Sequence, residues 1–163
     1  MKVAYWPGCV SRGFTPELHG AMAAIAPKLD IELVELDRAN CCGAGVIAEH
    51  NQELVDTLNA RTFAMAQRVE GAAGMMNICS TCQGAQSECQ ERLDADRGYR
   101  EHINSNLAAE QLSYERDDLG IPVLHLPQLL GLALGLEPKE LGMNKHVVGT
   151  GQVQRLVAEL AAA

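Results

Sequence analysis

Cysteines follow short strand-like segments at three places in the chain, and this placement limits the possible folds more than any other feature. The segments and their cysteines are Lys2–Trp6 with Cys9, Ile31–Leu36 with Cys41 and Cys42, and Gly74–Ile78 with Cys79 and Cys82. Each segment has the length and composition of a strand, and each runs toward Gly, Asn or Ser. The carboxyl ends of parallel strands meet at one edge of a sheet, so the sequence predicts that all five cysteines converge there.

Helical patterns separate these strands, and a fourth strand is predicted near the end of the chain at Ile121–Leu126. The predicted helices are Pro16–Leu29, Gln52–Glu70, Ala85–Asp96, Ile103–Tyr114 and Gln128–Leu136. This alternation predicts one α/β domain with a mostly parallel sheet flanked by helices and with cysteines at the strand carboxyl ends. We expect the domain to span residues 1–150, with residues 151–163, rich in Ala and Leu, as a helical C-terminal tail.

Charge and hydropathy exclude several classes of partner. The formal net charge of -8 argues against binding to nucleic acid, which requires clustered Lys and Arg. The longest apolar run, Val123–Leu136, is too short to cross a bilayer, which takes roughly 20 apolar residues, and the first residues do not resemble a secretory signal. We therefore expect a cytoplasmic protein with no direct membrane insertion, in which the 6 cysteines are ligands or redox thiols rather than disulfides.

The cysteine pattern points to a metal centre. Soft sulfur donors select zinc, cuprous copper or iron-sulfur clusters, and a strand-to-helix junction at Cys79-x-x-Cys82 favours the thiolate form that binds metal. Four ligands suffice for tetrahedral zinc or for a regular four-iron cubane, so a fifth sulfur is left over or bridges two irons. Cys41 and Cys42 can face one site only if the chain turns, and Gly43 and Gly45 permit that turn.

The order Cys9, Cys41-Cys42-Gly43 and Cys79-x-x-Cys82 resembles the CCG domain of the heterodisulfide reductase B subunit. The opening Tyr5-Trp6-Pro7-Gly8-Cys9 and the segment His125–Leu136 are also similar to that family. The resemblance implies that Cys9, Cys41, Cys42, Cys79 and Cys82 are the ligands of an unusual, non-cubane 4Fe-4S cluster that acts on a disulfide. The corresponding polypeptide of the methanogen enzyme has two such motifs, whereas this chain has one, and some family members hold zinc or a smaller cluster.

The resemblance implies an iron-sulfur subunit of a heterodisulfide reductase-like complex, which transfers electrons between a cluster and a disulfide or thiol substrate. Its expected partners are other subunits of such a complex or a second copy of the chain. The alternative is a non-catalytic interaction subunit of a dehydrogenase complex, stabilised by zinc or by a cluster.

Simpler interpretations stand beside this one. The five cysteines can be small buried apolar residues, Cys79 and Cys82 can form a thioredoxin-like dithiol, or four sulfurs can hold structural zinc. Cys89 is about two helical turns beyond Cys82, which favours core packing. His50 follows the double cysteine and can act as a hydrogen-bond donor near cluster sulfur. Leu129–Leu136 is interpreted as core or a partner contact, and the direction of Arg61 stays open.

Overall fold

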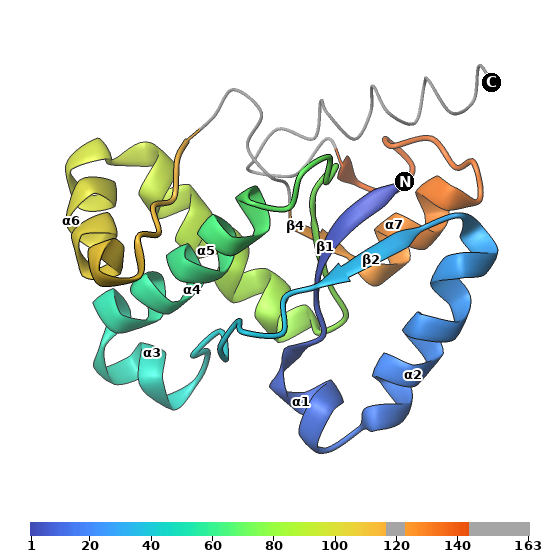
Figure 1. Ribbon diagram of the computed structural model, residues 1–163, viewed down its shortest axis with the longest axis horizontal. Helices are drawn as coiled ribbons and strands as arrows, with labels where there is room; N and C mark the ends of the chain where they lie inside the picture. The colour runs from blue at the N-terminus through green and yellow to red at the C-terminus, as the bar shows by residue number, and fades with distance from the viewer. Residues whose placement is uncertain (117–122, 144–163) are drawn as a thin grey trace.

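The computed structural model describes residues 1–116 and 123–143, and its centre is a parallel sheet (Figure 1). The described strands are β1 (Lys2–Trp6), β2 (Glu32–Glu35), β3 (Met75–Asn77) and β4 (Val123–His125). Every pair of neighbours is parallel, in the order β2-β1-β3-β4. The predicted α/β fold is therefore confirmed, with β1 and β3 as the inner strands.

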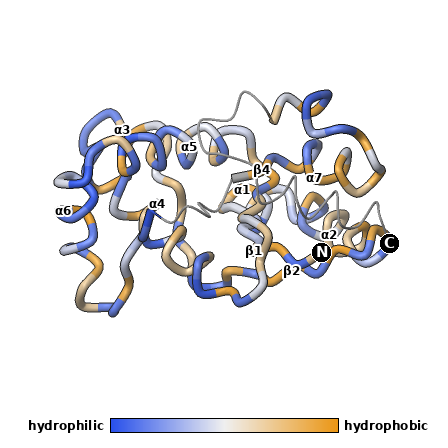
Figure 2. Tube along the Cα trace, turned by 90° about the horizontal axis from the view of Figure 1, so that it is seen from above, coloured by the Kyte–Doolittle hydropathy of each residue, from blue (hydrophilic) through white to orange (hydrophobic). Residues whose placement is uncertain are grey.

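Helices cover both faces of this sheet. Their bounds are α1 (Gly8–Gly13), α2 (Pro16–Ile25), α3 (Val46–His50), α4 (Gln52–Gln67), α5 (Ser80–Ala95), α6 (Arg97–Leu107) and α7 (Leu126–Ala133). Along β1, Ala4 packs in a core with α4, α5 and α6, whereas Val3 and Tyr5 pack in a second core with α2 and α7. Hydrophobic residues run along the strands, while hydrophilic residues dominate α6 (Figure 2). The alternation of β1 therefore builds two cores, one on each face.

Several predicted helix boundaries were wrong. Helix α5 begins at Ser80 rather than Ala85, because Cys79 is its N-cap residue, so Cys82 lies inside the helix. Helix α6 spans Arg97–Leu107 rather than Ile103–Tyr114, because the side chain of Asp96 accepts a hydrogen bond from the backbone N–H of Tyr99 and starts the helix there.

The remaining predictions differ from the structure in smaller ways. Helices α1 and α3 were not predicted, and both are short. Helix α2 begins at Pro16 as predicted and gives way to a 3-10 turn that contains Pro27. Helix α7 begins two residues earlier than predicted, where His125 and Gln128 form a capping box. The tail at 151–163 and the boundary at 150 lie outside the described residues.

Among the helices of residues 1–116 and 123–143, none combines the length and the apolar character needed to cross a membrane.

Candidate functional site

The segments that follow β1, β2 and β3 gather at the carboxyl edge of the sheet, which is the lower edge in Figure 1. They are α1, the segment between β2 and α3, and the start of α5. Cys9 is the second residue of α1, Cys41 and Cys42 lie between β2 and α3, and Cys79 and Cys82 lie at the start of α5. Three adjacent strands thus deliver the five predicted site residues to one place, although two of the cysteines lie in helices rather than in loops.

The five thiols form one series of contacts. The Sγ atoms of Cys9 and Cys41 are 3.6 Å apart. Cys41 also contacts Cys42, the thiol of Cys82 donates a hydrogen bond to the sulfur of Cys42, and Cys79 contacts Cys82. Sulfurs from all three segments are therefore linked without a break.

Burial divides this series into an inner and an outer part. The side chains of Cys42 and Cys82 are almost fully buried, at 4% and 3% exposure. Cys9 and Cys41 are exposed, and Cys79 is half-buried. A group held by these thiols would be enclosed on its inner side and open to an approaching molecule beside Cys9 and Cys41.

The protonation of the thiols follows from their contacts. The hydrogen bond from Cys82 lowers the pKa of Cys42 to about 6. The same hydrogen bond, together with burial, raises the pKa of Cys82, while burial raises the pKa of Cys41. Although Cys82 lies in the first turn of a helix, the neighbouring sulfur of Cys42 and burial raise the pKa of its thiol. The thiolate expected at this helix start belongs to the metal-bound form and stays a prediction.

Side chains of α4 and its neighbours fix the double cysteine in place. Asn59 Nδ2 donates to the backbone oxygen of Cys42 at 2.9 Å, and Asn40 Nδ2 donates to the backbone oxygen of Cys41 at 3.0 Å. Arg61 Nη1 in turn donates to Asn40 Oδ1 at 3.2 Å. These hydrogen bonds set the direction in which both thiols leave the backbone.

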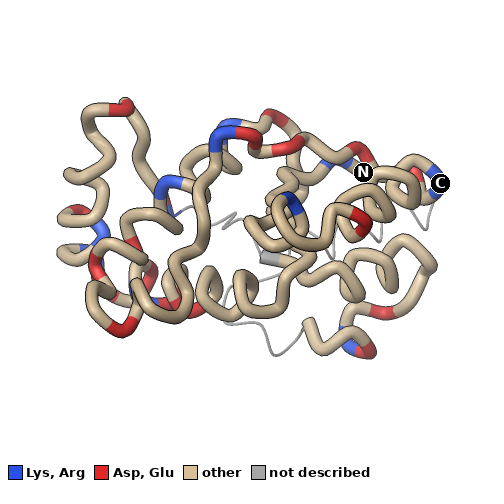
Figure 3. The backbone as a smooth tube through the Cα atoms, turned by 90° about the horizontal axis from the view of Figure 1, so that it is seen from below, with Lys and Arg blue, Asp and Glu red and all other residues tan. Residues whose placement is uncertain are grey.

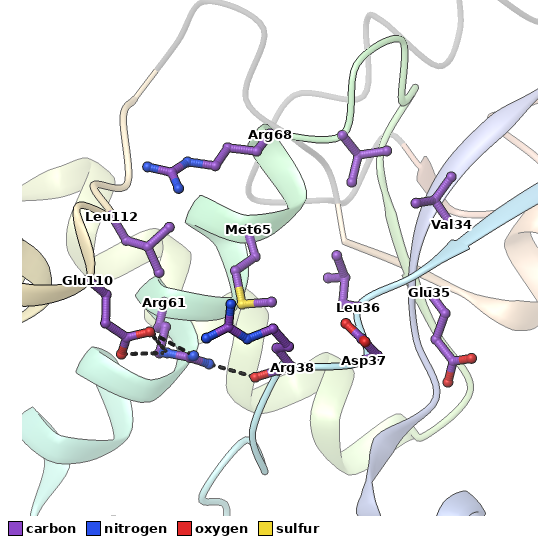
Figure 4. A pocket seen from close by; sticks show the side chains of 11 residues that line it. Val34, Glu35, Leu36, Asp37, Arg38, Arg61, Met65, Arg68, Glu110 and Leu112 are labelled. Atoms are coloured by element: carbon purple, nitrogen blue, oxygen red, sulfur yellow. Dashed lines mark hydrogen bonds and ion pairs between the residues drawn. The ribbon is translucent and has the colours of Figure 1, made fainter.

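Arg61 does not face the cysteines, which settles the direction that the sequence left open. Its guanidinium makes hydrogen bonds of 2.8–3.0 Å with the carboxylate of Glu110 and of 2.8 Å with the backbone oxygen of Arg38 (Figure 4). It lines a pocket of about 360 Å³ between β2 and α4, to which Met65 and Arg68 also contribute. Arg61 therefore supports the site indirectly, by holding Asn40 and the backbone before Cys41 and Cys42 in place.

Two glycines allow the chain to pass close to its neighbours. Gly43 has a φ of +74°, and a Cβ there would lie 2.9 Å from Val55 Cγ2, so the predicted turn after Cys42 depends on this glycine. Gly8 has a φ of +83°, and its Cβ would lie 3.7 Å from Cys82 Sγ. The first and third cysteine segments thus meet at Gly8.

The donor set fits an iron-sulfur cluster. The described residues include no group of three or more Cys, His, Asp or Glu side chains placed to hold one metal ion. The five thiols extend as a series from buried to exposed, and Gly8 leaves the space beside Cys82 free of a side chain. Thiolate sulfur is the donor that iron-sulfur clusters take in proteins.

The other sequence candidates lie apart from this series. Cys89 is fully buried in the core with α4 and α6, as predicted. His50 is the exposed last residue of α3, and none of its described contacts involves a cysteine. Leu129 and Leu132 are buried in the core of α2 and α7, whereas Leu134 and Leu136 are exposed.

Sequence reasoning missed the supporting residues Asn40 and Asn59, and it named Arg61 without finding its role. Asn59 carried a detectable signal, because it follows Val55 by one turn on the apolar stripe of the predicted helix and a polar residue there needs a partner. Asn40 and the role of Arg61 carried no such signal, because their partners are distant along the chain: Arg61 is 21 residues from Asn40 and 49 residues from Glu110.

A family model described as "CCG: Cysteine-rich domain" matches residues 3–85. The chain is 35% identical over 119 residues to the 8-methylmenaquinol:fumarate reductase membrane anchor subunit of Wolinella succinogenes, covering 70% of this chain and 39% of that protein. It is 31% identical over 128 residues to the B subunit of the ferredoxin/F(420)H(2)-dependent CoB-CoM heterodisulfide reductase of Methanosarcina acetivorans, covering 77% and 36%. The chain thus spans less than two fifths of the length of these curated relatives.

Among solved structures, the fold is similar to a crystal structure of a hypothetical protein from Helicobacter pylori. The TM-score is 0.65 at 17% identity, and the match covers 75% of this chain and 24% of that one. This likeness concerns the fold alone.

Proposed function

The chain belongs to the family of cysteine-rich CCG domains, and on that premise we propose that it is the iron-sulfur subunit of a heterodisulfide reductase-like complex. Cys9, Cys41, Cys42, Cys79 and Cys82 would hold a non-cubane 4Fe-4S cluster, which would supply electron transfer to or from a disulfide or thiol substrate. The names of the relatives support a redox subunit, since one is a heterodisulfide reductase subunit and another belongs to a fumarate reductase.

The observation that carries the proposal is the unbroken series of five thiols from three strand ends. A dithiol at Cys79 and Cys82 would leave the contacts of Cys42 and Cys41 without a role. A cluster bound here would supply electron transfer at a potential set by its surroundings. The side chains of Asn40 and Asn59 donate hydrogen bonds to the backbone oxygens of Cys41 and Cys42 and so fix the positions of both thiols. Little conformational entropy would then be lost when a cluster is bound.

The outer part of the site suits an approaching sulfur compound or protein. Residues 7–11, 39–48 and 78–87 contain no Lys, Arg, Asp or Glu, although the whole chain has 34 such residues. This edge is the side seen in Figure 3. Exposed apolar side chains follow two of the cysteine segments along the chain, with Phe14 at the end of α1 at 83% exposure and Val46 at the start of α3 at 72%. Cysteine segments without charged residues, together with exposed apolar groups, support contact with another protein subunit at this edge.

Electron balance supports the need for a partner. Reducing one disulfide consumes two electrons and two protons and yields two thiols, whereas one iron-sulfur cluster commonly passes one electron at a time. The single motif of this chain supplies one cluster. A second redox centre on another subunit, or on a second copy of the chain, would supply the other electron.

The test is anaerobic disulfide reduction by the cluster-loaded protein with an artificial electron donor, with and without the proteins encoded beside it. We expect slow turnover by the chain alone, a large increase with a cysteine-rich partner, and co-sedimentation of the two. Rapid turnover by a strict monomer would contradict the need for a partner. A colourless protein with stoichiometric zinc would favour the alternative function, a non-catalytic interaction subunit.

We also propose that the protein works in the cytoplasm. A reducing compartment keeps cysteines available as cluster ligands, whereas an oxidising one would join exposed neighbours such as Cys9 and Cys41 in a disulfide. Fractionation of cells with an antibody against the native protein tests this proposal, and recovery in an exported fraction would contradict it.

A further inference from the structure

Buried polar atoms without hydrogen-bond partners gather just behind the cysteines. Four of them, among the described residues, are Trp6 Nε1, Asn59 Oδ1, Asn77 Oδ1 and Gln86 Nε2. Trp6 ends β1 and Asn77 ends β3, so both stand directly before a cysteine segment. Native proteins leave few buried polar atoms unpaired, and each such atom requires an explanation.

Trp6 and Asn77 point to the same side of the sheet. Strands β1 and β3 pair Ala4 with Met75 and Trp6 with Asn77. Ala4 and Met75 both lie in the core with α4, α5 and α6. Because side chains two residues apart on a strand share a face, Trp6 and Asn77 point toward α4 and α5 as well.

Gln86 continues this polar layer on α5. Its Oε1 accepts a hydrogen bond from Asn77 Nδ2 at 2.8 Å. Gln86 follows Cys82 by four residues on the buried face of the helix, so the two side chains are neighbours about one turn apart. Gly8, two residues after Trp6, also lies against Cys82. The polar layer therefore lies between the inner thiols and the apolar core.

This layer offers N–H donors. The indole of Trp6 can only donate. Asn77 and Gln86 share one hydrogen bond, and turning both amides around would exchange their roles while still leaving one unpaired NH₂ group and one unpaired oxygen in the pair. Donors held in a buried place beside thiolate ligands match an acceptor that carries negative charge, such as cluster sulfur.

We propose that the indole N–H of Trp6 and the amide pair of Asn77 and Gln86 donate hydrogen bonds to sulfur atoms of the cluster or of its cysteine ligands, and that these bonds raise its reduction potential. The inference rests on the proposed function, because it requires the cluster. Hydrogen bonds to sulfur stabilise the reduced cluster more than the oxidised one, since reduction adds negative charge.

The experiment compares Trp6→Phe and Gln86→Met with a matched control, Tyr5→Phe. Tyr5 precedes Trp6 on β1 and is also buried, but it packs in the core on the opposite face of the sheet, where its hydroxyl contacts His19. Removing that hydroxyl therefore leaves the polar layer intact. Reduction potentials are measured by an EPR-monitored titration of each cluster-loaded protein. We expect Trp6→Phe to lower the ratio of reduced to oxidised cluster at least tenfold at a fixed potential, or about 59 mV for one electron, with Tyr5→Phe unchanged.

A second readout follows the proton directly. Exchange into D₂O should give a deuterium coupling to the cluster in the wild-type protein, and Trp6→Phe should remove part of it. If Trp6→Phe does not hold a cluster, the reduction potential of Gln86→Met is measured in the same titration, and a potential below that of wild type supports the inference. A loaded variant with the wild-type potential would overturn the inference, whereas a wild-type protein without iron and sulfide would overturn the proposed function itself.

Discussion

Two buried regions of this protein contain cysteine, and they differ in whether their polar groups are satisfied. At the carboxyl edge, five thiols contact one another and the atoms Trp6 Nε1 and Gln86 Nε2 behind them lack partners among the described residues. Between α4, α5 and α6, Cys89 is fully buried, its thiol lies 3.6 Å from the backbone oxygen of Asp56, and burial raises its pKa well above the ordinary value.

In the region between α4, α5 and α6, the buried carboxylate of Asp56 has all of its hydrogen-bond partners within the protein. It accepts hydrogen bonds from Gln52 at 3.1 Å, from Arg92 at 2.7 and 2.9 Å, and from Tyr99 at 2.9 Å. These bonds join α4, α5 and α6 through one fully buried side chain. A satisfied network of this kind stabilises the fold, whereas a region that leaves donors unpaired is suited to receive a ligand.

The largest expected difference between the two regions concerns iron. We expect Cys42→Ser to lose most of the iron of the anaerobically prepared protein, because the proposed cluster would lose one of its buried thiolate ligands. Cys89→Ser should leave the iron content nearly unchanged. Iron analysis of both variants measures this contrast, and equal losses would contradict the assignment of Cys42 as a ligand.

The second prediction concerns stability. Asp56→Asn should lower the free energy of unfolding by about 3 kcal/mol. This value lies at the low end of the range for a broken buried ion pair, because the partner Arg92 is about a third exposed and water screens its charge. Iron per folded molecule should stay the same. Denaturant unfolding of the metal-free protein tests this, and a loss of iron without a loss of stability would show that the two regions are not separate.

The same substitution should change the response to acid. Burial alone would raise the pKa of Asp56, but hydrogen bonds from Arg92 and Tyr99 lower it below its ordinary value of 3.8. A lowered folded pKa contributes stability that is present above the unfolded value and is lost as the pH falls through the folded one. Below about pH 4, wild type should therefore lose stability more steeply than Asp56→Asn. Parallel curves would contradict the role of Asp56.

A smaller effect on iron retention is expected from Arg61, which supports the segment that carries Cys41 and Cys42. Arg61→Met should weaken iron retention about tenfold, because Asn40 and the segment before Cys41 lose their support. Arg97→Met is the control, since Arg97 is exposed and pairs with Glu101 on its own helix. The rate of iron transfer to a chelator measures the effect, and equal rates for both variants would remove Arg61 from the site.

The smallest effect is predicted for His50→Ala, which should keep the iron content and reduction potential of wild type. His50 is exposed, and none of its described contacts involves a cysteine. A clear shift of potential in this variant would mean that His50 does reach the cluster.

The sequence predicted the sheet and the meeting of the five cysteines, because strand periodicity and chain topology are encoded locally. Prediction from the sequence failed for features that depend on contacts between residues far apart in the chain. Nothing near Cys82 indicated that its thiol would hydrogen-bond to Cys42, 40 residues away, and thereby raise its own pKa. The start of α6 was missed because the N-cap Asp96 was placed inside the preceding helix. The polar layer of Trp6, Asn77 and Gln86 became visible only when β1, β3 and α5 were placed together.

The central claim, that the carboxyl edge holds an iron-sulfur cluster, is tested most directly by metal and sulfide analysis of the anaerobically purified wild-type protein. We predict a brown protein with about four irons and a matching amount of acid-labile sulfide per chain. A colourless protein with one zinc per chain and no sulfide would contradict the claim.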